Sequence, residues 1–176
     1  LETLGCFFNN LGNSYNDVND LQAALLALNR AVEINPGLSE SHSNLGNVYM
    51  KLGKVDAAID QYKTALEINN RDARSHNNIA NAYVQKEKFQ KAINEYRTAI
   101  DLDPNFLNSY SNLASVYSNQ QMHNEAIAIL KKGLIWFEKS EQLLVQLGDV
   151  YTKAGNFIEA KFYYQRALDV NSVSAE

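Results

Sequence analysis

A 34-residue period runs through nearly all of this chain and limits it to a helical repeat structure. A leucine–glycine pair, or an isoleucine–alanine or leucine–alanine equivalent, is followed by a tyrosine in every unit. These tyrosines are Tyr15, Tyr49, Tyr83, Tyr117 and Tyr151. Apolar residues within each unit lie three and four positions apart, which is helical spacing and not strand alternation. The period places five units at 5–38, 39–72, 73–106, 107–140 and 141–174.

The second half of each unit repeats as faithfully. A small residue recurs at Ala24, Ala58, Ala92, Ala126 and Ala160, where a bulky side chain would push two helix axes apart. A large apolar residue follows four positions later, another small residue three after that, and Pro36 and Pro104 close two of the units. This pattern resembles the tetratricopeptide repeat (TPR) family over roughly residues 5–174. The resemblance implies an all-α, right-handed superhelical solenoid that forms one domain.

The breaks between apolar runs predict ten helices, two for each repeat. Their expected ranges are 5–17, 20–34, 39–52, 55–68, 73–86, 89–102, 107–120, 123–137, 141–154 and 157–170.

Composition excludes several classes of protein. A net charge of −4 argues against nucleic-acid binding, which calls for a basic stripe. No apolar run approaches the roughly 20 residues needed to span a membrane. One cysteine, Cys6, allows no internal disulfide and fits a reducing compartment, so we expect a cytoplasmic or nucleocytoplasmic protein.

The chain stops soon after the last expected helix, without the polar capping helix that repeat arrays usually carry. We therefore expect either a fragment of a longer protein or an open end that another chain covers, for example in a homo-oligomer.

A column of amide side chains is the most suggestive functional feature. Directly before each leucine–glycine pair, or its equivalent, stand Asn10, Asn44, Asn78, Asn112 and then Gln146. Three positions further on stand Asn13, Asn47, Asn81, Ser115 and Asp149. Asparagine is a poor helix former because its side chain competes for backbone hydrogen bonds, so this recurrence needs a compensating role.

Similarity to TPR solenoids implies that the first helix of each pair lines the concave surface. Segments such as Ser43–Asn47 and Ser111–Ser115 resemble the TPR region of the nucleocytoplasmic O-linked N-acetylglucosamine transferase family, whose asparagine ladder binds the backbone of substrate polypeptides. Helices about 8–10 Å apart and an extended chain advancing about 3.3 Å per residue would let one amide meet every third residue. The alternative is that the amides bond to the neighbouring repeat and hold the repeats in register.

We include Asn9, Asn77, Arg74 and Lys51 in the predicted peptide-binding set because they lie on the same helices. A carboxylate clamp would need more cations than the window of Asn9, Asn13, Asn47, Arg74 and Asn78 supplies. Acids and bases of the predicted groove balance, so we expect a polar or weakly charged polypeptide, bound weakly through the amides alone.

Chemistry within the segment is not expected. His42 and His76 occupy the same position of adjacent repeats, where Tyr110 and Leu144 stand later, so we expect packing roles for both. There is no phosphate-binding glycine loop and no nucleophile–base pattern, and we predict no catalytic residue, no metal site and no cofactor.

The outer face becomes apolar toward the C-terminus, where earlier repeats are polar. The residues concerned are Ile129, Ile135, Trp136, Phe137, Phe162 and Tyr163. Such clusters often mark contact surfaces, so we predict a second interface there.

The sequence thus favours a protein-interaction scaffold that holds an extended polypeptide. Two alternatives stay open: the substrate-recognition arm of a glycosyltransferase whose catalytic domain lies elsewhere, and a self-assembly module acting through apolar ends or the outer face.

Overall fold

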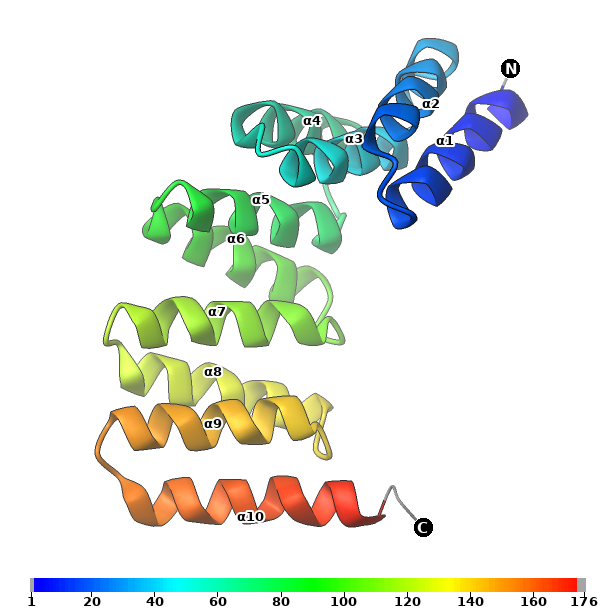
Figure 1. Cartoon of the computed structure of the whole chain (residues 1–176). Helices are drawn as coiled ribbons and strands as arrows, with labels where there is room; N and C mark the ends of the chain where they lie inside the picture. The colour runs from blue at the N-terminus through cyan, green and yellow to red at the C-terminus, as the bar shows by residue number, and fades with distance from the viewer. Residues whose placement is uncertain (1, 174–176) are drawn as a thin grey trace. The chain divides into compact units, whose positions relative to one another are not determined.

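The computed structural model describes residues 2–173, which form ten α-helices and no strand (Figure 1). The helices are α1 (Glu2–Asp17), α2 (Leu21–Ile34), α3 (Ser39–Lys51), α4 (Val55–Ile68), α5 (Ala73–Gln85), α6 (Phe89–Leu102), α7 (Leu107–Asn119), α8 (His123–Trp136), α9 (Glu141–Lys153) and α10 (Phe157–Val173). The predicted all-α repeat fold is confirmed. The largest differences from the expected ranges are at the two ends, where α1 begins at residue 2 and α10 ends at residue 173.

The chain divides into two compact units, Leu1–Glu95 and Tyr96–Glu176, with the boundary inside α6. The expected single domain over 5–174 stays a prediction, and its last residue lies outside the described part of the chain.

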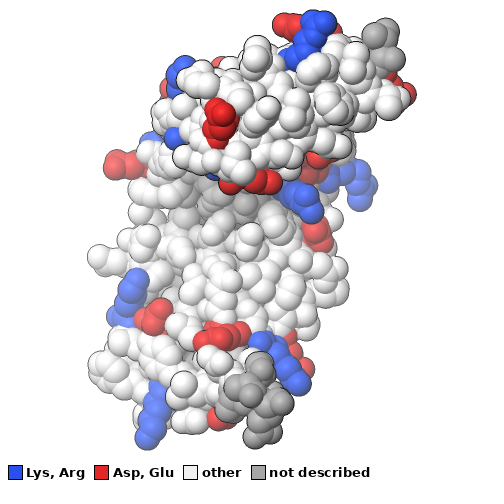
Figure 2. Space-filling view, turned by 45° about the vertical axis from the view of Figure 1, so that its right-hand side comes forward, with Lys and Arg blue, Asp and Glu red and all other residues white. Residues whose placement is uncertain are grey.

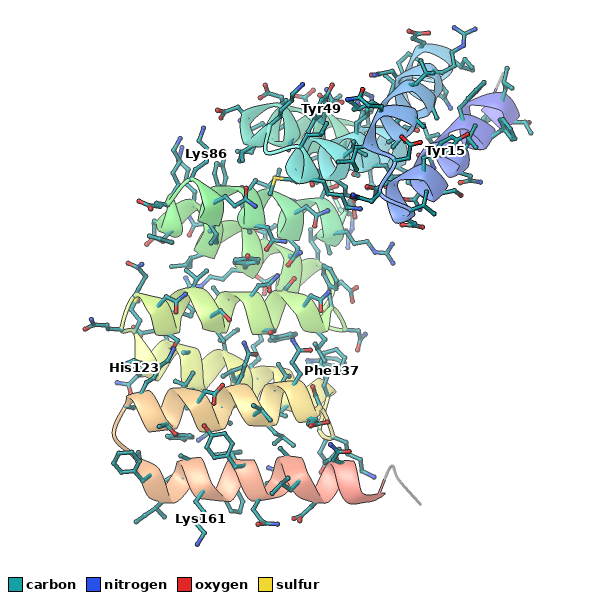
Figure 3. All side chains as sticks on the ribbon, viewed as in Figure 1. Tyr15, Tyr49, Lys86, His123, Phe137 and Lys161 are labelled. Atoms are coloured by element: carbon teal, nitrogen blue, oxygen red, sulfur yellow. The ribbon has the colours of Figure 1, made fainter. Side chains whose placement is uncertain are left out.

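The turn between the two helices of each repeat has the same hydrogen bonds in all five repeats. In the second repeat, the Lys54 N–H donates to the Tyr49 carbonyl at 2.9 Å and the Gly53 N–H donates to the Met50 carbonyl at 3.0 Å. This pair of bonds is the Schellman motif, which needs one residue in the left-handed region. Gly53 takes that conformation with φ of 72°. The repeated tyrosine is therefore a fixed point of the turn, labelled for Tyr15 and Tyr49 in Figure 3.

Not every repeat has a residue suited to that conformation. The corresponding positions are Asn19, Glu87, Gln121 and Gly155, with φ between 55° and 77°. Glycine adopts this conformation without steric cost and asparagine with little, whereas glutamate and glutamine carry a penalty of about 1–2 kcal/mol. The repeat fold thus imposes its turn on residues that do not favour it.

Close packing inside a repeat depends on the small residue of the leucine–glycine pair. A Cβ atom added to Gly46 would lie 2.4 Å from Cε1 of Tyr62, and one added to Gly148 would lie 2.6 Å from Cε1 of Tyr164. The Tyr62 ring therefore lies directly on the backbone of α3, and only 1% of the side chain is exposed. The glycine of the pair thus marks a close approach of two helices, in addition to the alanines singled out in the sequence.

Successive repeats share an apolar core. In the first unit, Ala24 and Leu28 of α2 pack with Leu45 and Val48 of α3, and all four are buried. The next cluster continues this arrangement with Ala58, Tyr62 and Ile79. In the first unit α3 packs against both α2 and α4, which fixes the direction in which its remaining face points.

Candidate polypeptide-binding site

The first amide column lies at the border between core and solvent in the first unit. Asn10 of α1 is exposed, and Asn44 of α3 and Asn78 of α5 are half-buried. Leu45, the residue after Asn44, is buried in the core. Because a helix turns about 100° per residue, the Asn44 side chain points away from the core when Leu45 points into it. The core packing of the leucine therefore holds the amide before it at the edge of the open face.

The column amides donate hydrogen bonds to the preceding repeat. Nδ2 of Asn44 donates to Oδ1 of Asn9 at 2.9 Å, and Nδ2 of Asn78 donates to Oδ1 of Asn47 at 3.0 Å. The alternative role inferred from the sequence, bonding between repeats, is thus present for Asn44 and Asn78. Their acceptors are the side-chain oxygens of Asn9 and Asn47. An amide has two N–H groups and a carbonyl, so each column residue keeps capacity for a further partner.

Asn47 of the second column accepts two hydrogen bonds. Its Oδ1 accepts from Asn78 and also from the hydroxyl of Tyr62, at 2.8 Å. Two bonds use both lone pairs of that oxygen, so the NH₂ group of Asn47 is the end left for other partners. Asn13 is exposed and Asn81 is half-buried.

Two residues of the predicted set do not belong to the open face. Asn9 is 2% exposed and Asn77 is 4% exposed. Asn9 accepts from Ser41 Oγ at 3.1 Å as well as from Asn44, which makes it a buried acceptor between α1 and α3. Both side chains therefore lie beneath the open face, and their part in peptide binding stays a prediction.

Two adjoining cavities open beside the columns of the first unit. One has a volume of about 350 Å³ and is lined by Asn16, Asn47, Met50, Lys51, Tyr62, Asn78 and Asn81. The other, of about 490 Å³, is lined by Asn13, Ser39, Glu40, Ser43, Asn44, Asn47, Asn69, Asp72, Arg74 and Asn78. We call them the Lys51 pocket and the Glu40 pocket. Asn47 and Asn78 line both, so the two pockets share one polar wall.

Charge is sparse around these cavities. Of the described residues that line the Lys51 pocket, Lys51 alone is charged, and its Nζ donates to the backbone carbonyl of Asn16 at 2.7 Å. Arg74, Glu40 and Asp72 line the Glu40 pocket, and Asp72 accepts from Ser75 Oγ at 2.6 Å. On the face seen in Figure 2, acidic and basic side chains are interspersed over a mostly uncharged surface. Such a surface does not steer strongly charged ligands.

The second unit carries a smaller version of the same arrangement. Nε2 of Gln146 donates to Ser115 Oγ at 3.0 Å and to the Ser111 carbonyl at 3.2 Å. The longer side chain of Gln146 thus makes the bond to the preceding repeat that asparagine makes in the first unit. A cavity of about 180 Å³ is lined by Ala114, Ser115, Ser118, Asn119, Gln146, Asp149, Val150 and Lys153. Asn112, in the same column, is half-buried.

The sequence interpretation missed the tyrosines that reach the columns from the second helices. The hydroxyl of Tyr62 bonds to Asn47, and that of Tyr164 donates to Oδ1 of Asp149 at 2.7 Å. Burial raises the pKa of the Tyr62 hydroxyl, so it stays a donor. A signal was available: a buried tyrosine needs a hydrogen-bond partner, whereas Leu28 and Leu130 at the same position do not.

The predicted second interface is only partly exposed. Ile135 is 78% exposed, Phe162 is 56% exposed and Trp136 is 52% exposed. The remaining members, Ile129, Phe137 and Tyr163, are half-buried.

Two of these half-buried residues pack on their own unit. Phe137, labelled in Figure 3, makes an edge contact with Tyr110, and Tyr163 stacks on Tyr151 with ring centres 5.5 Å apart. The exposed part of this surface is therefore smaller than predicted.

The two histidines have packing roles, as predicted. His42 is buried, with Nδ1 2.9 Å from Gln61 Oε1 and Nε2 3.1 Å from the Pro36 carbonyl. His76 is half-buried and lies 2.7 Å from a carboxylate oxygen of Glu95. Among the described residues no group of three histidine, cysteine or acidic side chains is arranged to hold a metal ion. No helix within residues 2–173 is long and apolar enough to cross a membrane.

Two family models match the chain. The model described as TPR repeat matches residues 12–53, 46–87 and 80–121, and the model described as tetratricopeptide repeat matches residues 105–172. No significant match was found among the curated proteins.

Several solved structures share the fold. The crystal structure of MamA protein is 22% identical, with a TM-score of 0.82 over 99% of this chain and 96% of that one. A structure of pilF from Pseudomonas aeruginosa is 21% identical, with a TM-score of 0.85 over 96% and 77% of the two chains. YrrB, described as a TPR protein with an unusual peptide-binding site, is 20% identical, with a TM-score of 0.71 over 93% and 84%. At sequence identities this low, the similarity shows a shared fold and nothing further about this chain.

Proposed function

Because the chain belongs to the tetratricopeptide repeat family, we propose that it is a protein-interaction scaffold that binds an extended polypeptide along its amide columns. Proteins of this family act as protein–protein interaction scaffolds. The observation that carries the finer proposal is the arrangement of Asn44, Asn47 and Asn78, whose amides line adjoining open pockets in the first unit.

The hydrogen bonds between repeats support this role. Asn44 and Asn78 are each oriented by a bond to the preceding repeat, so little side-chain entropy remains to be lost when a ligand arrives. The second N–H of each amide and the remaining acceptor capacity of its carbonyl match the carbonyl and N–H of a peptide backbone. The ligand is read through its main chain, so its side-chain sequence contributes less than its extended shape.

Affinity through the amides alone is low. A hydrogen bond contributes a net of about 0.5–1.5 kcal/mol, and association costs about 4–15 kcal/mol. A few amides therefore give micromolar or weaker binding, and the pockets beside them supply the remainder through side-chain contacts.

The experiment must separate an effect on peptide binding from an effect on protein stability, because Asn44 lines the pocket and also bonds to the preceding repeat. We would titrate an unstructured polar peptide into the wild-type protein and into the Asn44→Ala and Asn9→Ala variants, each checked for helicity. Asn9→Ala breaks the same Asn44–Asn9 hydrogen bond from its buried side and leaves the Asn44 amide in place. It is therefore a matched control for the loss of that bond.

The proposal predicts that Asn44→Ala weakens peptide binding several-fold and that Asn9→Ala does so much less. Equal losses in the two variants would make the column purely structural. Binding unchanged in both would place the ligand elsewhere.

A second contact surface on the second unit is favoured by the exposure of Ile135, Trp136 and Phe162. We propose that it serves association with another protein. Sedimentation of the wild type and of the Phe162→Asp variant at several concentrations tests self-association, and a monomer in both cases would exclude a second copy as the partner.

A further inference from the structure

The Lys51 pocket of the first unit contains a cation, and binding of a peptide backbone by the amide columns does not require one. We propose that this pocket receives an acidic side chain, Asp or Glu, of the bound polypeptide. The inference rests on the proposed function and adds a side-chain preference at one point of the amide columns.

Two donor groups of the Lys51 pocket keep N–H groups for a ligand. Lys51 uses one N–H of its ammonium group on the Asn16 carbonyl, at 2.7 Å, which fixes its position and leaves two N–H groups. Oδ1 of Asn47 already accepts from Tyr62 and Asn78, so its NH₂ group is what remains for a ligand. A carboxylate offers two oxygens that only accept, and bonds to an ammonium group are stronger than neutral ones.

The volume and the lining of the Lys51 pocket suit the methylene groups of an acidic side chain. Its volume of about 350 Å³ exceeds that of the corresponding cavity in the second unit. The half-buried side chain of Met50 supplies apolar surface against which the methylene groups of Glu or Asp pack, and the nearly buried Tyr62 lies beneath it. The pocket thus joins an apolar lining to donors at one side.

The neighbouring Glu40 pocket disfavours the same ligand. Glu40 and Asp72 line it against one cation, Arg74, and Glu40 is exposed. An acidic side chain is therefore favoured at Lys51 and disfavoured on the other side of the Asn47–Asn78 wall. This contrast sets the register of the polypeptide along the first unit, because like charges near each other are unfavourable.

The corresponding cavity of the second unit differs from the Lys51 pocket by an acidic residue in its lining. Asn119 stands at the repeat position of Lys51, and Asp149 stands at that of Asn81. Its base, Lys153, stands one repeat beyond Asn119, also at the repeat position of Lys51, and donates to Ser118 Oγ at 3.3 Å. The acid Asp149 lines the same cavity, whereas no acid lines the Lys51 pocket among the described residues. The preference for an acid is confined to the first unit.

The first arm of the test uses a ligand too small to need the amide columns. N-acetyl-glutamate N-methylamide and its glutamine analogue are titrated into the protein while NMR follows the side-chain amide of Asn47 and the backbone of Lys51. We expect saturable shifts with the glutamate compound, weaker ones with glutamine, and none in Lys51→Gln. Lys63→Gln, which removes an equal charge from the exposed face of α4, should behave as wild type. Equal shifts with both compounds, or none, would overturn the inference.

The second arm uses an unstructured polar peptide with one Glu and its Glu→Gln analogue. The Glu peptide should bind about fivefold more tightly, because a charge-assisted bond replaces a neutral one. Lys51→Gln should abolish this preference and Lys51→Arg should keep it, while a salt concentration of about 1 M should reduce it.

The two arms separate the two claims. Peptides that bind through Asn44 without a Glu preference would refute the acid pocket and leave the proposed function intact. If the glutamate compound binds at Lys51 while no peptide binds, the proposed function is refuted and the acid-binding pocket stands.

Discussion

Replacing Gly46 with alanine should destabilise the protein, although alanine is the better helix former. Alanine gains about 1 kcal/mol over glycine in a helix interior. Against this, the new Cβ would lie 2.4 Å from Cε1 and 2.6 Å from Cδ1 of Tyr62. The ring cannot move aside easily, because it is 1% exposed and its hydroxyl is bonded to Asn47. Overpacking of this kind costs about 1–3 kcal/mol, so we expect a net loss of about 1 kcal/mol.

The opposing terms can be separated in a double-mutant cycle with Tyr62→Leu. The chain contains a natural counterpart of the double variant in its fourth repeat, where Ala114 and Leu130 are both buried. Gly46→Ala should be destabilising in the wild type and neutral or stabilising in the Tyr62→Leu background, with a coupling of about 1–2 kcal/mol. Urea denaturation followed by circular dichroism measures each variant. A stabilising Gly46→Ala in the wild-type background would refute the packing argument.

Three further predictions follow from particular contacts. Tyr62→Phe should cost about 1 kcal/mol of stability and also weaken peptide binding, since the hydroxyl orients Asn47. Denaturation and peptide titration of one preparation measure both effects. Unchanged binding would show that Asn47 binds the peptide without the hydrogen bond from Tyr62. Glu87→Gly should raise stability by about 0.5–1 kcal/mol because Glu87 has φ of 55°, whereas Glu87→Ala, which keeps the Cβ, should give no such gain in the same denaturation assay. The hydrogen bond from Lys86 lowers the pKa of Asp56 below 3.8. The wild type should therefore be more stable than Asp56→Asn above about pH 4, and this difference in stability should disappear as the pH falls further. Melting temperatures of both proteins at several pH values test the direction of this change.

The period and the small residues predicted most of the fold because both are local signals. A 34-residue spacing of tyrosines located every turn between paired helices, since the Schellman bonds always involve the tyrosine carbonyl. Alanines such as Ala24 and Ala58 indicated where two helices approach closely, and both are fully buried. These features depend on spacing and size, which are visible in the sequence.

The site was harder to predict because exposure depends on neighbouring helices. Asn9 and Asn10 are adjacent and chemically identical, yet α3 covers the first and leaves the second in solvent. Amide identity alone assigned both to the binding face. Tyr62 was missed for the opposite reason: its repeat position is a packing position, and only the three-dimensional contact shows its hydroxyl beside Asn47.

The strained turns were also not predicted. Nothing in the local sequence around Glu87 or Gln121 favours a left-handed residue, and the conformation is imposed by the packing of the two helices on either side. A repeat with a weak turn residue can thus keep its fold because the other repeats and the shared core specify the same geometry.

The measurement that tests the central claim most directly is a comparison between a bound peptide and its backbone N-methylated analogues. N-methylation removes one main-chain donor and leaves every side chain in place. If the amide columns read the main chain, methylation at the residues that meet Asn44 and Asn78 should weaken binding about fivefold to tenfold per site, and the loss should shrink in Asn44→Ala. Analogues that bind as well as the parent peptide would contradict the account.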